Sequence, residues 1–513
     1  MPIYDLVFVG SGLSSTATIT NLLTSLQNRP ILAQPLRIAV IEKSGEFWTG
    51  IAYGKRTSVH SLTINPVKDF FQDADKPIFF DWLTNMRNQG WPGLTDEKRG
   101  IAETWSTGNS DKITASDLEG LYIPRFLYGV FLTQHAEKLV ADCATAGIAT
   151  VDLITGEAVD ADKTDDGYLL SVNNAGPIIQ LHTRDLVLAT GSLDARLINN
   201  GLQHNYVCVD DVYGPSLKDN LDKISEGLSK LEPGKRDILI IGSNASASEV
   251  VHILAKNIKT DADGFDKIYI LSTSGLPDRL HVNSDYDHLM HNLKALDESG
   301  TYDADKLIAA IQDDVNHAAT QGLSVGKIHY SLGERAVKIQ QKLPADEALK
   351  FFKDHGWTFT RITRRTSENY YFTEKELADA GRLEFINGRF VRFAAEQDDP
   401  NGLTFIYTEC KQGDPKPYQG AFAVVVNCSG AEHITETTSK LIRNMLDKSI
   451  VRINDTNMGV SVNEHFAAND HLYIIGPLMA GIYNSKFKFW HLENAKRLNS
   501  LAPMLAKTLL AER

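Results

Sequence analysis

The stretch DLVFVGSGLSSTATITNLL, residues 5–23, has the sequence of a strand, a tight turn and a helix. Its apolar run from Leu6 to Val9 leads directly into Gly-Ser-Gly, and a helix rich in small residues follows. In such a unit the backbone N–H groups of the turn and the helix N-terminus face a pyrophosphate, which the glycines allow to approach closely. The stretch therefore predicts a dinucleotide site with contacts from Gly10, Gly12, Ser14 and Ser15, where Ser15 takes the place of the motif's third glycine.

The next strand, LRIAVIEK at 36–43, ends in an acid that extends this pattern. A carboxylate in this position accepts hydrogen bonds from the ribose hydroxyls of the nucleotide. Thirty residues separate Gly12 from Glu42, against about 20 in the usual pattern, and the segment TSLQNRPILAQP at 24–35 accounts for the excess as an inserted loop. We assign Glu42 and its neighbour Lys43 to the cofactor, the alternative being a glycine turn with a purely structural role.

Three later segments repeat the design of an apolar strand that ends in a glycine turn. They are HTRDLVLATGS (182–192), AFAVVVNCSG (421–430) and DHLYIIGPLMAG (470–481). This ordered set resembles the two-dinucleotide flavoproteins, in which such segments join the domains and close over the flavin. The resemblance implies that the opening turn holds FAD and that Gly191 and Gly476 contribute to the same site.

A second strand, turn and helix lies in KRDILIIGSNASASEVVHIL, residues 235–254. It is similar to the G-x-G-x-S-A-x-E turn of the nicotinamide domain in flavin monooxygenases. Gly242, Ser246, Ala247 and Glu249 match that pattern, while Asn244 replaces its middle glycine. Since asparagine tolerates a left-handed backbone better than most residues, we expect the turn to survive, with Gly242, Asn244 and Ser246 as contacts.

The strand after this helix, KIYILSTSG at 267–275, ends in Ser-Thr-Ser rather than in an acid. An arginine close behind an uncharged strand end favours a nucleotide 2′-phosphate, and so NADPH over NADH. Arg279 is the predicted phosphate contact, and an ordinary surface arginine is the alternative.

These motifs predict an α/β protein with two dinucleotide-binding, Rossmann-like domains. The FAD domain is expected to be discontinuous, at 1–195 and 415–513, with the NADPH domain inserted at 196–414. Within the NADPH domain, the charged segment at about 286–356 has helical patterning and is expected to form a helical insertion.

Composition narrows the class of protein further. The 513 residues carry a net charge of −13, which argues against a general nucleic-acid or anionic-membrane binder. No apolar run approaches the roughly 18 residues of a membrane span, and no signal peptide is recognised, so a cytoplasmic location is expected. The four cysteines form no C-x-x-C pair, which excludes a zinc ribbon and a dithiol mechanism. No metal site is expected.

The region 42–130 resembles two families of flavoproteins. FWTGIAYG (47–54), IFFDWL (78–83) and YIPRFLYGVFL (122–132) are similar to a broad bacterial family of FAD/NAD(P)-binding proteins that includes a flavin-dependent urate hydroxylase. The segment at 361–390 agrees with that family as well.

The same region resembles the N-hydroxylating monooxygenases that act on ornithine and lysine. Phe47-Trp48 stands where these enzymes carry F-x-W-H, and NPVKDFF (65–71) stands where they carry S-F-L-K-D-L. Further on, DRLHVNSDY (278–286) is similar to their P-F-V-N segment. The resemblance implies Lys68 and Asn283 as substrate contacts, although the serine and the histidine of those motifs are absent here.

Trp48, Asn65 and Arg125 are assigned to the flavin side of the site. Each of the polar candidates has a structural alternative. Lys68 would otherwise be a solvated helix start, Asn65 a turn former, and Arg125 the partner of a buried carboxylate.

The resemblance implies a single-component monooxygenase that uses FAD, NADPH and O₂ to hydroxylate a small molecule, with the amine nitrogen of an amino acid as the preferred target. No catalytic acid–base pair is expected, because the flavin itself carries out the oxygen chemistry. Two alternatives remain open: a flavin enzyme that oxygenates carbon or sulfur, and a flavin-binding protein without turnover. The oligomeric state is left open.

Overall fold

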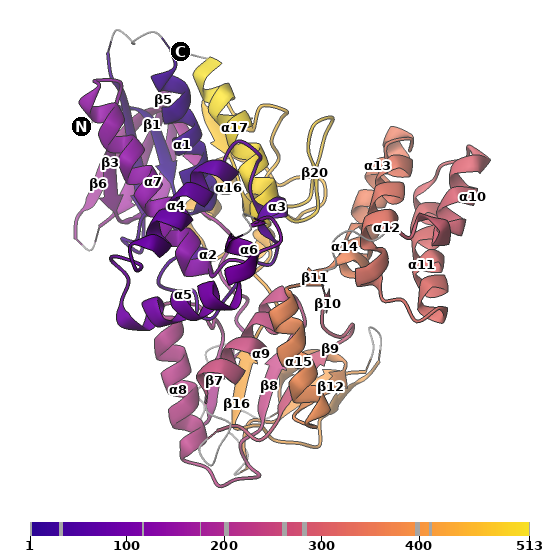
Figure 1. Ribbon diagram of the computed structural model, residues 1–513. Coiled ribbons are helices and arrows are strands. Elements are labelled where there is room, and N and C mark those ends of the chain that lie inside the picture. Colours follow the sequence, from indigo (N-terminus) through magenta and orange to yellow (C-terminus); the bar gives the residue numbers. More distant parts are fainter. Residues whose placement is uncertain are drawn as a thin grey trace. The chain divides into compact units, whose positions relative to one another are not determined.

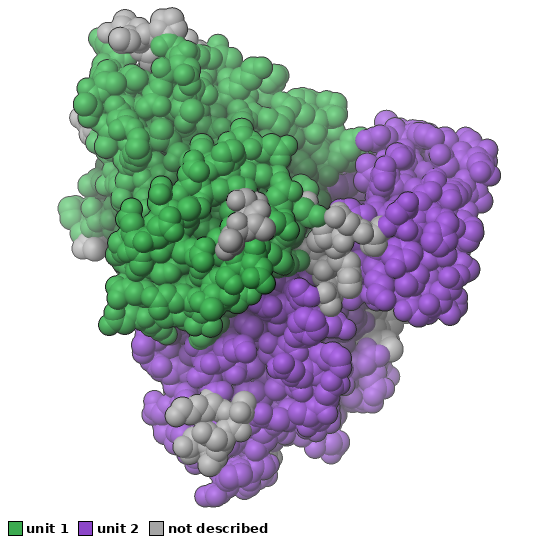
Figure 2. Space-filling model, in the orientation of Figure 1, with its two compact units in different colours: residues 1–194, 431–513 green, residues 195–430 purple. Residues whose placement is uncertain are grey.

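The computed structural model describes residues 3–29, 34–114, 117–174, 176–199, 205–258, 264–279, 285–394, 401–409 and 413–511. The chain divides into two compact units, coloured separately in Figure 2. The first unit comprises residues 1–194 and 431–513, and the second comprises residues 195–430.

The first unit is built on a mainly parallel sheet with the order β17-β18-β6-β1-β2-β3. Strand β1 lies between β2 and β6 and is parallel to both, and β18 extends the sheet beyond β6. The first residues of β6, 178–183, also pair with β5, which in turn pairs with β4, and both pairings are antiparallel. The strands are β1 (Ile3–Val9), β2 (Leu36–Glu42), β3 (Ala149–Thr155), β4 (Glu157–Thr164), β5 (Gly167–Asn173), β6 (Ile178–Leu188), β17 (Ala467–Asn469) and β18 (Leu472–Ile474), with a separate hairpin of β19 (Ile482–Tyr483) and β20 (Lys488–Phe489).

The helices that cover this sheet come from both ends of the chain. The last helix, α17, packs against α1, and α1 also packs against α7, as Figure 1 shows at the indigo and yellow ends of the colour scale. The helices are α1 (Leu13–Gln27), α2 (Gly50–Tyr53), α3 (Val67–Phe70), α4 (Lys76–Asn88), α5 (Asp96–Gly108), α6 (Ser110–Thr114), α7 (Arg125–Thr145), α16 (Lys440–Asp447) and α17 (Ala495–Ala511). The C-terminal return is therefore part of the core of the first unit, not an appendage.

The second unit has its own parallel sheet with the order β12-β9-β8-β16-β7. Helices α8, α9 and α15 belong to this unit, and α9 packs against α15. These elements are β7 (Val207–Val209), α8 (Leu217–Ser229), β8 (Ile238–Ile241), α9 (Ala245–Asn257), β9 (Ile268–Ser272), α15 (Glu368–Asp379), β12 (Leu383–Asn387) and β16 (Val424–Asn427). Two smaller sheets accompany it: β10 (Asp278–Arg279) with β11 (Arg365–Thr366), and β13 (Arg389–Phe393) with β14 (Phe405–Thr408) and β15 (Pro415–Pro417).

A group of helices interrupts the second unit between β10 and β11. They are η1 (Asp287–Leu289), α10 (His291–Ser299), α11 (Ala304–Thr320), α12 (Val325–Gln340), α13 (Ala345–Lys350), the π-turn η2 (Phe351–His355) and α14 (Gly356–Thr363). The helical segment therefore extends past the 286–356 expected from the sequence, to Thr363.

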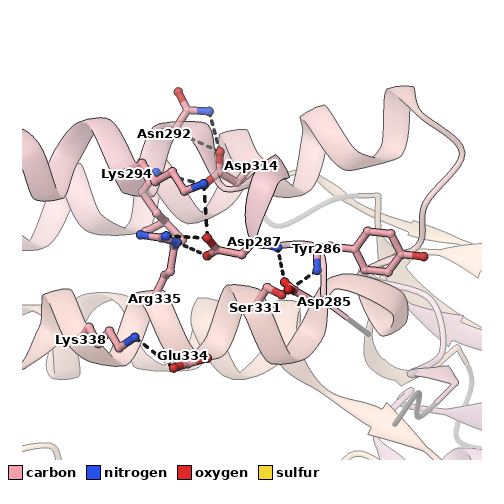
Figure 3. A network of polar contacts seen from close by, with 11 residues as sticks. Asp285, Tyr286, Asp287, Asn292, Lys294, Asp314, Ser331, Glu334, Arg335 and Lys338 are labelled. Carbon is pink, nitrogen blue, oxygen red and sulfur yellow. Dashed lines mark hydrogen bonds and ion pairs between the residues drawn. The ribbon is translucent and has the colours of Figure 1, made fainter. Parts of the chain in front are cut away.

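Two buried or half-buried carboxylates join these helices, as Figure 3 shows. Asp314 is fully buried on α11 and accepts from the backbone N–H groups of Asn292 and Leu293 at 2.8 and 3.0 Å, which caps the start of α10. Asp287 accepts from the guanidinium of Arg335 on α12, with one bond of 2.6 Å, and pairs with Lys294 at 3.3 Å. The Arg335 hydrogen bond is the main reason that the pKa of Asp287 falls to about 2.

One predicted boundary differs from the structure. The FAD domain was expected to resume at 415, but β16 lies in the sheet of the second unit, paired with β7 on one side and β8 on the other. All four residues of β16 are buried there, so its apolar run belongs to this sheet, and the first unit resumes at 431. The assignment of FAD to the first unit and NADPH to the second remains a prediction at this point.

Candidate dinucleotide-binding sites

The turn after β1 requires glycine at its first position. Gly10 has φ of +100°, and a Cβ there would lie 2.3 Å from the carbonyl oxygen of Ala189 at the end of β6. The Gly10 N–H donates to the carbonyl of Ile41 on β2 at 2.8 Å. Three strand ends therefore converge on this residue, and no side chain fits between them.

A second close approach lies between Gly12 and Gly50. Gly50 has φ of +61°, and a Cβ on it would lie 2.9 Å from the Cα of Gly12. Gly12 is the N-cap of α1 and provides no side-chain acceptor for the first-turn N–H groups of that helix. Free N–H groups at a helix N-terminus bind anions such as a pyrophosphate. Gly50 was not among the predicted residues, although it lies within the quoted segment FWTGIAYG.

Glu42 is held beside this turn. Its buried carboxylate accepts from the Ser11 N–H at 3.0 Å, from the Ser44 N–H at 3.0 Å and from the Ser44 hydroxyl at 2.8 Å. These bonds fix the carboxylate at the end of β2, where the motif predicts a ribose contact.

The backbone of Trp48 is hydrogen-bonded to side chains of the same turn and of the helix that follows it. The Trp48 N–H donates to the Ser11 hydroxyl at 2.7 Å, and the Trp48 carbonyl accepts from the Thr16 hydroxyl at 2.9 Å. Trp48 is buried and has a left-handed backbone with φ of 76°. Ser11 and Thr16 were not predicted, because their role depends on a segment more than 30 residues away.

Several buried polar atoms beside the turn have no hydrogen-bond partner within the described part of the chain. They are Ser15 Oγ, Trp48 Nε1 and Thr49 Oγ1. Buried polar groups are nearly always hydrogen-bonded, so orphaned atoms grouped around a glycine turn and a helix N-terminus fit a site that a polar cofactor completes. The residues present are thus compatible with FAD.

The remaining residues assigned to the flavin are spread around this turn. A Cβ on Gly476, which has φ of +105°, would lie 2.9 Å from Ser14 Oγ, so the turn after β18 meets α1. Gly191 has φ of +80° just after β6. Lys43 is more than half exposed and pairs with Asp194 at 3.7 Å.

Asn65, Lys68 and Arg125 lie on neighbouring segments of the first unit. Arg125, at the start of α7, donates from Nε to the carbonyl of Leu62 at 3.0 Å. Asn65 Oδ1 accepts from Asn494 at 3.4 Å. Lys68 is half-buried in α3, and its backbone N–H donates to the carbonyl of Glu119 at 3.0 Å. Their roles toward flavin and substrate remain predictions.

Two predicted contacts cannot be placed. Asn283 lies outside the described residues. The backbone of Arg279 lies in β10 opposite Thr366, but its side chain is outside what the structure describes.

The turn after β8 repeats the geometry of the first turn. Gly242 has φ of +103°, and a Cβ on it would lie 2.3 Å from the carbonyl oxygen of Cys428 at the end of β16. The Gly242 N–H donates to the Leu271 carbonyl on β9 at 3.0 Å. As at Gly10, three strand ends meet at a glycine that no other residue can replace.

The backbone of Asn244 differs from the expectation. Asn244 is the N-cap of α9 with φ of −78° and ψ of −177°, an extended conformation rather than a left-handed one. The turn therefore does not need glycine at this position, which explains physically why asparagine is accepted. Ser246 follows in the first turn of α9.

The end of β9 carries hydroxyl groups and a guanidinium. The hydroxyls of Ser243 and Ser272 lie 2.5 Å apart, and the Ser274 N–H donates to Ser272 Oγ at 3.1 Å. Arg364 donates to the carbonyls of Ser243 at 2.8 Å and Ser274 at 3.0 Å. Sequence reasoning missed Arg364, although it lies in the segment at 361–390, which begins RITRRTS.

Within the described residues, no helix is long and apolar enough to cross a membrane. No cluster of histidine, cysteine, aspartate and glutamate in that part of the chain has an arrangement that could hold a metal ion.

The sequence of this chain matches a known family over its first third. Residues 7–193 match the family described as FAD-NAD(P)-binding. Proteins of Mycobacterium tuberculosis and Mycobacterium bovis are each 29% identical to it, over 99% of this chain and 96% of theirs, and both are described as uncharacterised.

Solved structures extend the similarity to the whole length. The ornithine N-hydroxylase of Kutzneria sp. 744 has a TM-score of 0.57 at 14% identity and full coverage of both chains. The L-lysine 6-monooxygenase of Pseudomonas syringae has a TM-score of 0.57 at 12% identity, over 99% of both chains. The cadaverine monooxygenase of Erwinia amylovora has a TM-score of 0.56 at 12% identity, over 100% of this chain and 94% of that one.

These matches confirm the predicted α/β fold with two dinucleotide-binding domains, and the predicted FAD and NAD(P) cofactors at the level of the family that matches. Residues 7–193 match the FAD-NAD(P)-binding family, in a chain that has the fold of the N-hydroxylating flavin monooxygenases.

Proposed function

We propose that this protein is a single-component, FAD-dependent monooxygenase that uses NADPH and O₂ to hydroxylate a small molecule. The observation that carries the proposal is the pair of glycine turns, each of which lies at the carboxyl ends of a parallel sheet in its own unit. The fold shared with three amine-oxidising enzymes supports an amine nitrogen as the atom that is hydroxylated.

FAD, when bound, supplies the transfer of electrons from NADPH to dioxygen. The chain's own residues bind and orient it. The N–H groups of the Gly10–Gly12 turn would face the pyrophosphate, and Glu42 would accept hydrogen bonds from the ribose. The bound cofactor would supply partners for the orphaned Ser15 and Trp48 atoms. No acid–base pair is required of the protein, whose task is to position the reactants and exclude water.

The substrate assignment rests on Lys68 and Asn283. An amino-acid carboxylate that enters a closed pocket needs a partner, because an unpaired buried charge is very costly. Lys68 on α3 is proposed as that partner. Cadaverine carries no carboxylate, and the enzyme named for it shares this fold. The role of Lys68 therefore separates an amino-acid hydroxylase from a diamine hydroxylase.

The test is a measurement of NADPH oxidation by the FAD-loaded protein against a panel of amino acids, the matching diamines and purines, with hydroxylamine detected as product. An amino acid should stimulate both signals. Lys68→Ala should raise KM for the amino acid about 10- to 100-fold and leave FAD content unchanged. The neighbouring exposed Lys55→Ala serves as the control.

Three outcomes would redirect the proposal. Normal turnover by Lys68→Ala would remove the carboxylate contact and favour a diamine. Oxidation of a purine, or of the sulfur of a sulfur-containing amino acid, without hydroxylamine would favour the carbon- or sulfur-oxygenating alternative. A flavin-containing protein that oxidises NADPH with no substrate of the panel, and forms no product, would contradict monooxygenase activity.

A further inference from the structure

We propose that Arg361 and Arg364 form the site that recognises the 2′-phosphate of NADPH, at the carboxyl ends of β8 and β9. This inference rests on the proposed function, in that it takes the second unit as the NADPH site. It assigns nucleotide selection to the segment at the end of the helical insertion, more than 80 residues beyond the end of β9.

Arg364 is placed where the adenosine end of a dinucleotide lies in a parallel sheet of this type. Its guanidinium donates to the Ser243 carbonyl in the turn after β8 and to the Ser274 carbonyl in the turn after β9. It also donates to the Gly275 carbonyl. The residue thus joins the pyrophosphate turn to the strand end from which the ribose is read.

The charge of Arg364 is not neutralised by any carboxylate among the described residues. Its described partners are carbonyl and hydroxyl oxygens. Burial and, to a smaller extent, the nearby cation of Arg361 together lower the pKa of Arg364 to about 10. Two guanidinium groups therefore repel each other in a partly desolvated place, which is unfavourable until an anion enters.

Arg361 has no assigned role in the described structure. It lies in the last turn of α14, three residues before the C-cap residue Arg364, and its cation is near enough to lower the pKa of Arg364. Its Nε is buried, and no described residue accepts a hydrogen bond from it. A buried donor without a partner is costly, and a phosphate oxygen is an acceptor that would satisfy it.

The surroundings fit a phosphate better than a ribose with a free hydroxyl. The hydroxyls of Ser243, Ser272 and Ser274 lie at the same strand ends and can donate to phosphate oxygens. Residues 272–275 contain no acid, so no carboxylate on this stretch accepts from a ribose hydroxyl or repels a phosphate. Arginine suits this task because its planar fork matches the geometry of phosphate oxygens.

The experiment is a calorimetric titration of the FAD-loaded full chain with 2′,5′-ADP, 5′-ADP and inorganic phosphate. We expect 2′,5′-ADP to bind about 10- to 100-fold more tightly than 5′-ADP, because it adds charge-assisted hydrogen bonds. Arg361→Ala should abolish most of that preference and leave the affinity for 5′-ADP unchanged. Arg389→Ala, which removes an exposed arginine on β13, should change neither value.

Thermal unfolding without nucleotide separates recognition from a structural role. Among the described residues, no acceptor pairs with Arg361 Nε, and removal of the side chain relieves repulsion with Arg364, so Arg361→Ala should unfold at the same or a higher temperature. Arg364→Lys keeps the charge but loses the fork, and should also reduce the preference for 2′,5′-ADP.

Three results would overturn the proposal. One is an Arg361→Ala variant that keeps the full preference, or that loses affinity for both nucleotides together with stability. Another is a preference for 2′,5′-ADP that is lost in Arg279→Ala but kept in Arg361→Ala and Arg364→Lys. The third is inorganic phosphate that binds as tightly as 2′,5′-ADP, which would make this a free-phosphate site.

Failure of the proposed activity would give a different result. A protein that prefers 2′,5′-ADP through Arg361 but oxidises no NADPH would refute the monooxygenase and leave the recognition site standing. A protein that oxidises NADPH and NADH with equal KM would refute the recognition site but would not contradict the proposed monooxygenase activity.

Discussion

The two dinucleotide turns have nearly the same backbone and opposite charge beside them. Gly10 and Gly242 have φ values of +100° and +103°, and each faces a carbonyl oxygen that a Cβ would approach to 2.3 Å. At the end of the next strand, the first turn has the carboxylate of Glu42, whereas the second has Ser272 and the guanidinium of Arg364. We infer from the difference that the backbone would fix where a pyrophosphate lies, while the charge at the neighbouring strand end would decide which ribose is accepted.

The largest effect is expected from replacing either glycine. Gly10→Ala should abolish FAD binding, and Gly242→Ala should abolish 2′,5′-ADP binding, because each Cβ meets a backbone carbonyl that cannot move. FAD content and calorimetric binding, measured on both variants, check this. Gly90→Ala, at φ of +71° with open space around it, carries the backbone strain without the clash and should keep both ligands.

The comparison would fail if one variant lost both ligands while remaining folded. It would also fail if Gly10→Ala lost 2′,5′-ADP binding and Gly242→Ala lost FAD, since the first turn would then bind NADPH.

In the second unit a carboxylate is buried against the helix that follows the glycine turn, and this predicts an effect of pH on the stability of that unit. Glu374 on α15 is buried against the hydroxyl of Ser248 on α9, and burial raises its pKa from 4.5 to about 7. The folded protein then holds a proton that the unfolded chain releases. The corresponding stability is fully present below about pH 4.5 and is lost as the pH rises through 7, by roughly 3 kcal/mol.

Glu374→Gln should reduce this dependence, leaving the part that comes from Asp237, whose pKa burial raises to about 6, and should stabilise the protein above pH 7. Chemical unfolding of both proteins between pH 5 and 8, followed by a probe in the second unit, measures it. Glu376→Gln, an exposed change on the same helix, should follow the wild type. Parallel pH profiles for wild type and Glu374→Gln would show that the carboxylate is not protonated in the fold.

A smaller effect is expected at the strand end of the first turn. Glu42→Ala should weaken FAD binding by about 1.5–3 kcal/mol, the value of a hydrogen bond to a charged group, or about 10- to 100-fold. The change should leave 2′,5′-ADP affinity as it is. Glu103→Ala, on the exposed side of α5, is the matched control. Unaltered FAD affinity in Glu42→Ala would mean that the carboxylate only supports the turn through Ser11 and Ser44.

The smallest effect is expected at Lys43, which follows Glu42 in the sequence but forms an exposed ion pair with Asp194. Exposed ion pairs contribute about 0–1 kcal/mol, so Lys43→Ala should change FAD affinity less than about fivefold. A loss as large as that of Glu42→Ala would instead make Lys43 a direct cofactor contact, as its sequence position predicts.

The parts of the fold that follow from local chemistry were predictable from the sequence. Gly10 and Gly242 mark turns because no other residue fits there, and an apolar run before each turn identifies a buried strand. The parts that depend on distant partners were not predictable. Gly50 matters through its contact with Gly12 across 38 residues, and Arg364 reaches the strand ends only after a long helical insertion.

The segment at 421–430 shows the same limit. Its strand and glycine turn resemble those at 182–192, and both were expected to serve the FAD domain. In the structure the later strand lies between β8 and β7. The sequence could not predict this, because a buried run of four residues fits any parallel sheet and only the pairing partners tell one sheet from the other.

The central claim is that the two turns hold the two cofactors of one electron-transfer pair. Anaerobic mixing of FAD-loaded protein with NADPH, followed by the absorbance of the oxidised flavin, tests it most directly. The account predicts that NADPH bleaches the flavin, that NADH does so at a much lower apparent affinity, and that Gly242→Ala retains its FAD but is no longer bleached. Two results would contradict the account. One is a wild-type flavin that stays oxidised when NADPH is added, and the other is a flavin in Gly242→Ala that NADPH reduces as it does in the wild type.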